Sequence, residues 1–397
     1  MKALVQALKT APDFMRAHQI DGWLVYDFRG SNPVMRQLLP SLSGMSRRGL
    51  LLMSTTEDRP ILLVHSIEKS HYSEIKNVSV ATYESRQSFV EKLGEILSGY
   101  RRVAMEYSPH GELPTASWVD GGTLELIRSL NVEIVSSADL SQVSLNTWSD
   151  AASESHRIAC RHVVAVKELA FEYIGLALSR GESPNEFEVQ QTIDRELAQR
   201  GLDTDHPAIV AANANSGNPH YVPQPCGSLH IGRDDWVLID LWARLPGEHN
   251  IFGDITWVGY TGKQPKPIHT KIFDIVRGAR DTVLLELKQA HIQGRILKGW
   301  ELDRVARDFI IAAGYGDYFV HRTGHSLGPG PSVHGLGVNL DDFESKDTRS
   351  ILPGGGFTVE PGIYVPDFGV RLEINVFINP DSGPELTTPL QDSITII

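Results

Sequence analysis

The chain has 397 residues, of which 41% are hydrophobic and 22% charged, and its formal net charge is −12. This composition is typical of a folded soluble protein, and the length favours two domains. No stretch is dense in Lys and Arg, and none approaches the ~18 consecutive apolar residues of a membrane helix, so we expect neither a nucleic-acid partner nor a membrane span. Two cysteines give no disulfide framework and the N-terminus lacks a secretory signal, which together predict a cytoplasmic protein.

The first 150 residues alternate short apolar runs with segments of helical periodicity. Apolar residues recur at helical spacing in 89–100 and 121–130. Strands alternating with helices predict an α/β domain at residues 1–150. The expected strands are 22–28, 49–54, 60–66, 102–107 and 132–137.

The pattern changes near residue 150. From there to about 200 the sequence predicts two long amphipathic helices broken at 181–186, with the second beginning at Ser183-Pro184. Strand-like segments follow Gly201, then a helical region from about 268 to 314, and strands again to the end. Residues 151–397 therefore read as an α+β domain of the size expected for a catalytic unit.

Four carboxylates occur inside or at the head of apolar strand patterns in this second domain. One such residue alone could bond a neighbouring turn, but burying an unpaired carboxylate is costly and the pattern occurs four times. The residues are Asp240 in VLIDLWARL, Asp254 in GDITWVGY, Glu360 in GGFTVEPGIYV and Glu373 in FGVRLEINVFI.

The last of these strands has one apolar and one polar face. Its period of two places Arg371, Glu373 and Asn375 on the side opposite its apolar residues, which indicates a polar cavity over a sheet. Arg371 is the only basic residue nearby whose side chain is expected on the same face as these carboxylates. One arginine cannot balance four carboxylates in a shared cavity, so further positive charge is needed. Divalent cations supply it, and the segment HRTGHSLGPGPSVHG (321–335) offers a histidine nitrogen as a further ligand.

These residues, in this order, resemble the ligand pattern of the pita-bread metallohydrolases: prolidase, aminopeptidase P, methionine aminopeptidase and the metal-free creatinase. The resemblance covers about residues 150–397, and the N-terminal domain is similar to the one that prolidase and aminopeptidase P carry. It implies a C-terminal pita-bread domain with an N-terminal creatinase-like domain. The matching ligand positions are Asp240, Asp254, His325 in TGHSLG, Glu360 in VEPGIY and Glu373 in VRLEIN.

The resemblance also implies how these ligands share two divalent cations per chain. Asp254 and Glu373 would bridge the cations, Asp240 would complete one, and His325 with Glu360 the other. Carboxylate-rich sites suit manganese, with zinc and cobalt also open.

The activity that the resemblance implies is hydrolysis of Xaa-Pro dipeptides by a hydroxide bridging the two cations. Glu360 would shuttle the proton, and the family's non-ligand histidines match His220, His321 and His334. Arg371 either holds the substrate carboxylate or serves as a partner of Glu373. The alternatives are an Xaa-Pro aminopeptidase acting on longer peptides, a metal-dependent hydrolase of a non-peptide substrate, and a non-catalytic binding protein. A lid or dimer-contact role for residues 1–150 predicts a homodimer.

The sequence departs from the family pattern beside the ligands. Asp240 is followed by Leu-Trp242 where the family usually has x-Gly, and the two aspartates lie 14 positions apart, a slightly longer spacing than usual. Trp257 replaces the usual Arg after the second Asp, and Gly335 stands in place of the Glu after the last histidine. We expect these departures to lie near the substrate and to affect substrate preference.

Overall fold

The computed structural model describes the chain except residues 1, 41–44, 58, 73–74 and 76. It divides into two compact units, Met1–Asn146 and Thr147–Ile397, each of which is described by itself. No helix among the described residues combines the length and apolar character needed to cross a bilayer.

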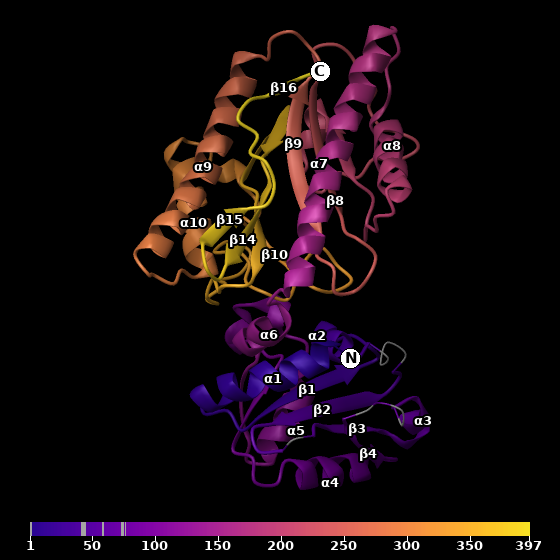
Figure 1. Ribbon diagram of the computed structural model, residues 1–397, viewed down its shortest axis with the longest axis vertical. Coiled ribbons are helices and arrows are strands. Elements are labelled where there is room, and N and C mark those ends of the chain that lie inside the picture. Colours follow the sequence, from indigo (N-terminus) through magenta and orange to yellow (C-terminus); the bar gives the residue numbers. More distant parts are fainter. Residues whose placement is uncertain (1, 41–44, 58, 73–74, 76) are drawn as a thin grey trace. The chain divides into compact units, whose positions relative to one another are not determined.

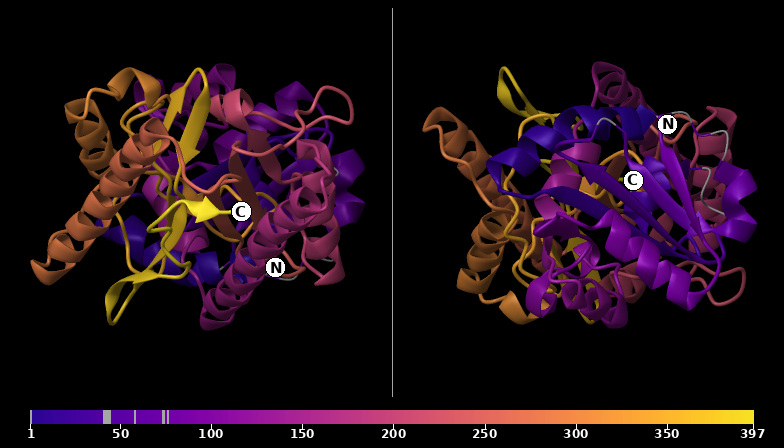
Figure 2. Two further views of the ribbon diagram at one scale, coloured as in Figure 1. Left: turned by 90° about the horizontal axis from the view of Figure 1, so that it is seen from above. Right: turned by 90° about the horizontal axis from the view of Figure 1, so that it is seen from below.

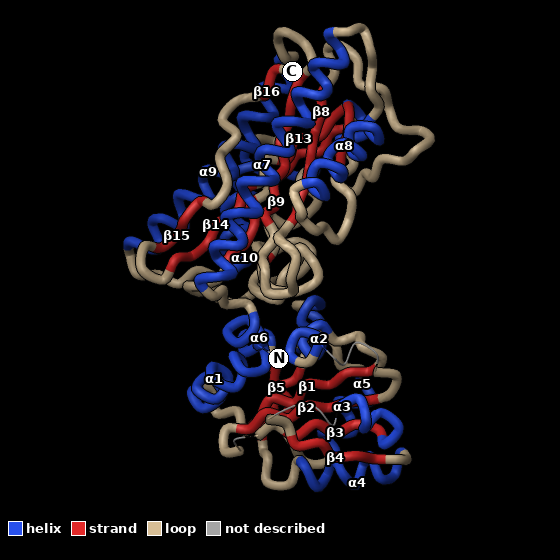
Figure 3. Tube along the Cα trace, turned by 45° about the vertical axis from the view of Figure 1, so that its right-hand side comes forward, coloured by secondary structure: helices blue, strands red, loops and turns tan. Residues whose placement is uncertain are grey.

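The N-terminal unit is a six-stranded mixed sheet in the order β4-β3-β2-β1-β5-β6, with helices packed beside it (Figure 3). Its core gathers apolar residues of these strands with those of the helices between Arg86 and Ser129. The expected strands are present, and a further one at Ser79–Tyr83 was not expected because SVATY carries little apolar alternation. The strands are β1 (Gly22–Phe28), β2 (Arg48–Ser54), β3 (Ile61–His65), β4 (Ser79–Tyr83), β5 (Arg102–Met105) and β6 (Glu133–Ser136). The helices are α1 (Lys2–Ala17), α2 (Pro33–Leu38), α3 (Lys69–Tyr72), α4 (Arg86–Ile96), α5 (Gly121–Ser129) and α6 (Ala138–Leu145).

The C-terminal unit contains four long helices and three small sheets. The sheets have the orders β16-β9-β8-β7, β10-β11-β14-β15 and β12-β13. The helices are α7 (Asp150–Ser179), α8 (Glu186–Gln199), α9 (Pro267–Ile292) and α10 (Gly299–Ala312). The strands are β7 (Ile209–Ala212), β8 (Trp236–Ala243), β9 (Gly253–Tyr260), β10 (Ser326–Leu327), β11 (Gly356–Val359), β12 (Gly362–Val365), β13 (Phe368–Arg371), β14 (Ile374–Asn379), β15 (Gly383–Leu386) and β16 (Thr395–Ile396).

Local sequence explains where the first two of these helices begin. The side chain of Ser149 accepts a hydrogen bond from the Ala152 N–H and caps α7. Asn185 caps α8 and forms a capping box with Glu188. The second helix therefore starts two residues after the expected Ser183-Pro184 boundary, because the stronger capping signal follows the proline.

The helices of the C-terminal unit cover its sheets from two sides (Figures 1 and 2). One face of the β8–β9 pair packs on α7 and α8 in one apolar cluster. The other cluster joins α9 and α10 to the opposite face of the pair and to β11–β14. The polar side chains of β8 and β9 face those of β13 and β14, as the bonds from Arg371 to Asp240 and Thr256 and from Asn375 to the Asp254 carbonyl show.

The segment 368–378 forms two strands instead of the single one that its periodicity predicts. The ladder breaks at Leu372 and Glu373, where the Glu373 N–H donates to the Thr256 carbonyl at 3.2 Å instead. The predicted faces are nevertheless present, since Val370 and Leu372 lie in the apolar core. A similar break separates β11 from β12 at Glu360-Pro361, because proline has no N–H for a ladder bond.

Candidate metal centre

Strands β8 and β9 carry two of the expected ligands on one face. In the antiparallel register Asp240 lies opposite Thr256, and Trp242 lies opposite Asp254. Residues opposite each other, or two apart on one strand, share a face, so all four side chains point to the same side of the sheet. Asp240 is 7% exposed and Asp254 only 3%. The hairpin therefore presents two buried carboxylates to the layer above it.

His325 reaches the same place from the start of β10. A Cβ at Gly324 would lie 2.0 Å from the Thr358 carbonyl oxygen, so this approach requires glycine. The His325 N–H donates to the Thr358 hydroxyl at 2.9 Å, and its Nδ1 lies 3.1 Å from the Ser326 carbonyl oxygen. A protonated Nδ1 donating to that carbonyl leaves the Nε2 lone pair facing Asp254 and Glu360.

Glu360 and Glu373 complete the group from the two strand breaks described above. Glu360 Oε1 accepts a hydrogen bond from the Thr358 hydroxyl at 3.1 Å. Glu373 Oε2 accepts one from the Thr256 hydroxyl at 2.7 Å. Both residues leave the ladder at the point where their side chains enter the site.

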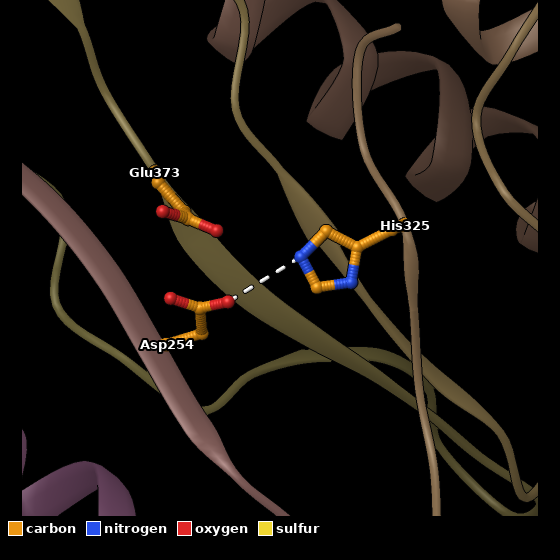
Figure 4. A group of neighbouring side chains, drawn as sticks. All are labelled: Asp254, His325 and Glu373. Atoms are coloured by element: carbon orange, nitrogen blue, oxygen red, sulfur yellow. Dashed lines mark ion pairs between the residues drawn. The ribbon is translucent and has the colours of Figure 1, made fainter. Parts of the chain in front are cut away.

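Asp254, His325 and Glu373 converge closely enough to hold one cation (Figure 4). One ligand atom from each lies within 4.8 Å of the others, and all three residues are buried. Asp254 Oδ2 is 3.3 Å from His325 Nε2, the contact drawn in the figure. A carboxylate, an imidazole and a second carboxylate from three separate segments form a set of metal-binding atoms.

The electrostatics of this group favour a cation. Burial, then repulsion from Asp240 and Glu360, raises the pKa of Asp254 well above its usual value. Burial, then repulsion from Asp254, does the same to the pKa of Glu373. Burial also raises the pKa of Glu360 to about 7. So many carboxylates in one buried place are stable as anions only with positive charge among them.

Unsatisfied oxygen atoms show that the residues fit such a cation. Among the described residues, Asp240 Oδ1 and Asp254 Oδ1 are buried without a hydrogen-bond partner. Buried polar atoms normally have a partner, so these two oxygens are available as ligands. Together with His325 Nε2, they make the donor set compatible with divalent cations.

Arg371 is committed to protein groups. Its Nη2 donates to Asp240 Oδ2, its Nε to the Thr256 hydroxyl at 3.0 Å and its Nη1 to the Tyr364 hydroxyl at 3.0 Å. The side chain is 6% exposed. These contacts favour its interpretation as a partner of the site carboxylates, directly for Asp240 and through Thr256 for Glu373.

The three other expected histidines occupy different environments. His321 is held internally, with Nε2 2.7 Å from the Tyr364 hydroxyl and Nδ1 2.7 Å from the Arg322 carbonyl oxygen. His334 is exposed, and its ring packs edge-on against His325 with 4.2 Å between centroids. His220 is exposed in the loop after β7. Only His334 contacts a ligand side chain directly.

Some residues of the site were not expected from the sequence. Thr256 links Arg371 to Glu373 through hydrogen bonds. It lies two residues after Asp254 on one strand, so the period of two could have placed it on the face of the ligands. Tyr364 joins His321 to Arg371. The expectation that Trp257 lies near the substrate was wrong. It lies on the opposite face of β9, packed on the α7 cluster with Lys167 Nζ 3.6 Å from its ring centroid.

The family of the chain follows from comparison with known proteins. The model of metallopeptidase family M24 matches residues 154–380, which include every candidate ligand. The chain belongs to metallopeptidase family M24. Its fold is that of the prolidase from Pyrococcus horikoshii OT3, at 24% identity and a TM-score of 0.63 over 97% of this chain and 98% of that one.

Two curated relatives are more similar in sequence over shorter spans. A putative dipeptidase, YkvY, of Bacillus subtilis (strain 168) is 32% identical over 228 residues, which cover 56% of this M24 chain and 56% of the relative. An Xaa-Pro dipeptidase of Lactobacillus helveticus is 29% identical over 210 residues, covering 52% and 50%. The matched region thus spans about half the length of these relatives.

Proposed function

We propose that this M24 metallopeptidase hydrolyses Xaa-Pro dipeptides with two divalent cations held by Asp240, Asp254, His325, Glu360 and Glu373. The observation that carries the proposal is the convergence of Asp254, His325 and Glu373 in one buried place. The unpaired oxygens of Asp240 and Asp254 support the larger ligand set. Manganese is the favoured cation because four of the five ligands are carboxylates.

Each residue around the ligands has a distinct task in such a reaction. When bound, the cations acidify a water molecule and polarise the scissile carbonyl. Glu360, whose carboxylate lies 3.7 Å from His325 Nε2 among the proposed ligands, would carry the proton to the leaving nitrogen. His334, exposed beside His325, is placed to donate to the developing oxyanion, and His220 is the second candidate for that role.

Arg371 and His321 act within the protein in this proposal. Arg371 orients Asp240 and Thr256, and His321 supports it through the shared Tyr364 hydroxyl. Two relatives that are named as dipeptidases support the proposed preference of this chain for dipeptides over longer peptides. We further propose that residues 1–150 serve as a lid or dimer contact in a homodimer.

The test compares hydrolysis of Ala-Pro with hydrolysis of Ala-Pro-Ala-Ala by the manganese-loaded protein. Faster release of alanine from the dipeptide supports the proposal, and faster release from the tetrapeptide indicates an aminopeptidase. Hydrolysis of neither would favour a non-peptide substrate or a non-catalytic role. Asp254→Asn should abolish turnover, whereas Asp381→Asn, the same change on an exposed turn, should not.

A further inference from the structure

Trp242 stands directly beside the candidate metal centre. It lies opposite Asp254 in the β8–β9 ladder and two residues after Asp240, so its side chain shares their face. The indole is partly buried and packs on an apolar cluster that includes Val333 and Leu327. A large flat side chain therefore borders the carboxylates on the side where the site meets the 328–336 loop.

The position of the indole is fixed by Asp205. Trp242 Nε1 donates to Asp205 Oδ1 at 2.5 Å, and Asp205 Oδ2 accepts a hydrogen bond from the Val333 N–H at 3.1 Å. The Asp205 side chain is only 14% exposed, which strengthens both charge-assisted bonds. The carboxylate thus ties the tryptophan to the residue that precedes His334.

The loop of the β8–β9 hairpin reinforces this arrangement. Arg244 Nη1 donates to the Gly330 carbonyl, and the Gly330 N–H donates to the Glu248 carbonyl at 3.0 Å. The hairpin is therefore bonded to the loop that carries His334 both directly, at Gly330, and through Trp242 and Asp205. An indole held in this way cannot swing aside without breaking its hydrogen bond and its packing.

We propose that Trp242, held by Asp205, is a specificity-determining residue that limits the size of the first residue of the substrate. The inference rests on the proposed function, in which the carbonyl of that residue approaches the cations at Asp254. Its side chain is attached to the α-carbon next to that carbonyl and so meets the wall beside Asp254. Small first residues such as glycine and alanine fit, and leucine and phenylalanine are disfavoured by the fixed ring.

The experiment measures kcat/KM for Gly-Pro, Ala-Pro, Leu-Pro and Phe-Pro in the manganese-loaded protein. Trp242→Ala should raise the ratio of Phe-Pro to Gly-Pro by about tenfold or more, the scale of discrimination by pocket shape. Trp242→Phe keeps a ring at the position and should leave the ratio much closer to that of the wild type. Trp257→Ala is the matched control, because it removes an indole from the opposite face of the neighbouring strand.

Isothermal titration calorimetry with the same dipeptides gives a second readout, and circular dichroism checks that each variant is folded. If Trp242→Ala is folded and the ratio of Phe-Pro to Gly-Pro changes neither in kcat/KM nor in affinity, the inference is overturned. Binding that gains tolerance for Phe-Pro without any hydrolysis removes the proposed function and keeps the inference. Failure of the wild type to bind any dipeptide overturns both.

Discussion

Asp254 and Glu373 are the two carboxyl groups of the site whose pKa is raised well above the usual value. Each is almost fully buried, and their carboxyl groups lie within 4.8 Å of each other. The hydroxyl of Thr256 and the guanidinium of Arg371 offset part of the cost of this burial. The remainder is offset when a cation binds, so cation binding and the stability of the fold are coupled at these residues.

The first prediction concerns protein treated with a chelator. Its melting temperature should fall as the pH rises from 6.5 to 8.5. Burial and neighbouring carboxylates raise the pKa of Asp254 and Glu373 well above that of an unfolded chain, and burial raises that of Glu360 to about 7. The folded state therefore loses protons as the pH rises through this range, and with them the stability that they contribute. Five histidines whose pKa burial lowers oppose the trend only at the lower end of the range, because an unfolded histidine, with a pKa of about 6.5, has lost most of its proton by about pH 7.5. They are His156, His269, His321, His325 and His334.

Differential scanning fluorimetry across this pH range provides the measurement. Adding manganese should remove most of the dependence, and so should the double variant Asp254→Asn/Glu373→Gln. A melting temperature that rises with pH in the chelated protein would show that these carboxylates are not protonated in the folded state.

At the scale of elements, the junction between β14 and β9 determines where Asp254 stands. The Asn375 side chain accepts a hydrogen bond from the Asp254 N–H at 2.9 Å and donates one to the Asp254 carbonyl at 2.6 Å. Asn375 is fully buried, and the Cys160 thiol of α7 lies 3.6 Å from its Oδ1. Gly253 allows this approach of α7, because a Cβ there would lie 2.7 Å from the Cys160 nitrogen.

The second prediction is that Asn375→Asp weakens cation binding. The new carboxylate can still accept from the Asp254 N–H, but as an anion it cannot donate to the Asp254 carbonyl, and it adds negative charge behind the site. We expect manganese affinity to fall by about 10- to 100-fold, the usual cost of losing a residue that orients a ligand. Competition with a fluorescent chelator measures the affinity. Asn379→Asp at the end of β14 is the control, and an equal loss in both variants would count against the role of Asn375.

Much of this arrangement was predictable from the sequence, because periodicity acts locally. The period of two assigned Arg371, Glu373 and Asn375 to one face, and the structure places all three side chains toward the site. The strand break at Glu373 was not predictable, because a bond to a distant segment replaces the ladder there, whereas Pro361 is a sequence signal for the break at Glu360. The same period of two places Trp257, three residues after Asp254 in β9, on the opposite face of the strand. The position of Trp257 away from the ligands was therefore also predictable from the sequence.

At the scale of the whole molecule, the two units have separate apolar cores. Every candidate ligand belongs to the unit Thr147–Ile397, and the family match at 154–380 lies within it. The sequence indicated this division through the change of pattern near residue 150. It offered no constellation of catalytic residues in the first 150 positions, so the lid or dimer-contact role there stays a prediction.

The third prediction follows from the separate cores. Calorimetry should resolve two unfolding transitions, and manganese should raise the temperature of only one of them. Cation at 100 times its dissociation constant should stabilise the C-terminal unit by about 2.7 kcal/mol per site. Asp254→Asn should abolish the shift. Equal shifts of both transitions, or one transition that moves as a whole, would mean that the units do not unfold independently.

The number of manganese ions bound per chain decides whether the five proposed ligands form a centre for two cations. Chelator-treated protein is titrated with manganese in a calorimeter, and the bound metal is then quantified by elemental analysis after gel filtration. We expect two ions per wild-type chain, with loss of binding in Glu373→Gln and unchanged binding in Asp381→Asn. A single ion would contradict the five-ligand assignment, and wild-type protein that binds none would contradict the metal centre itself.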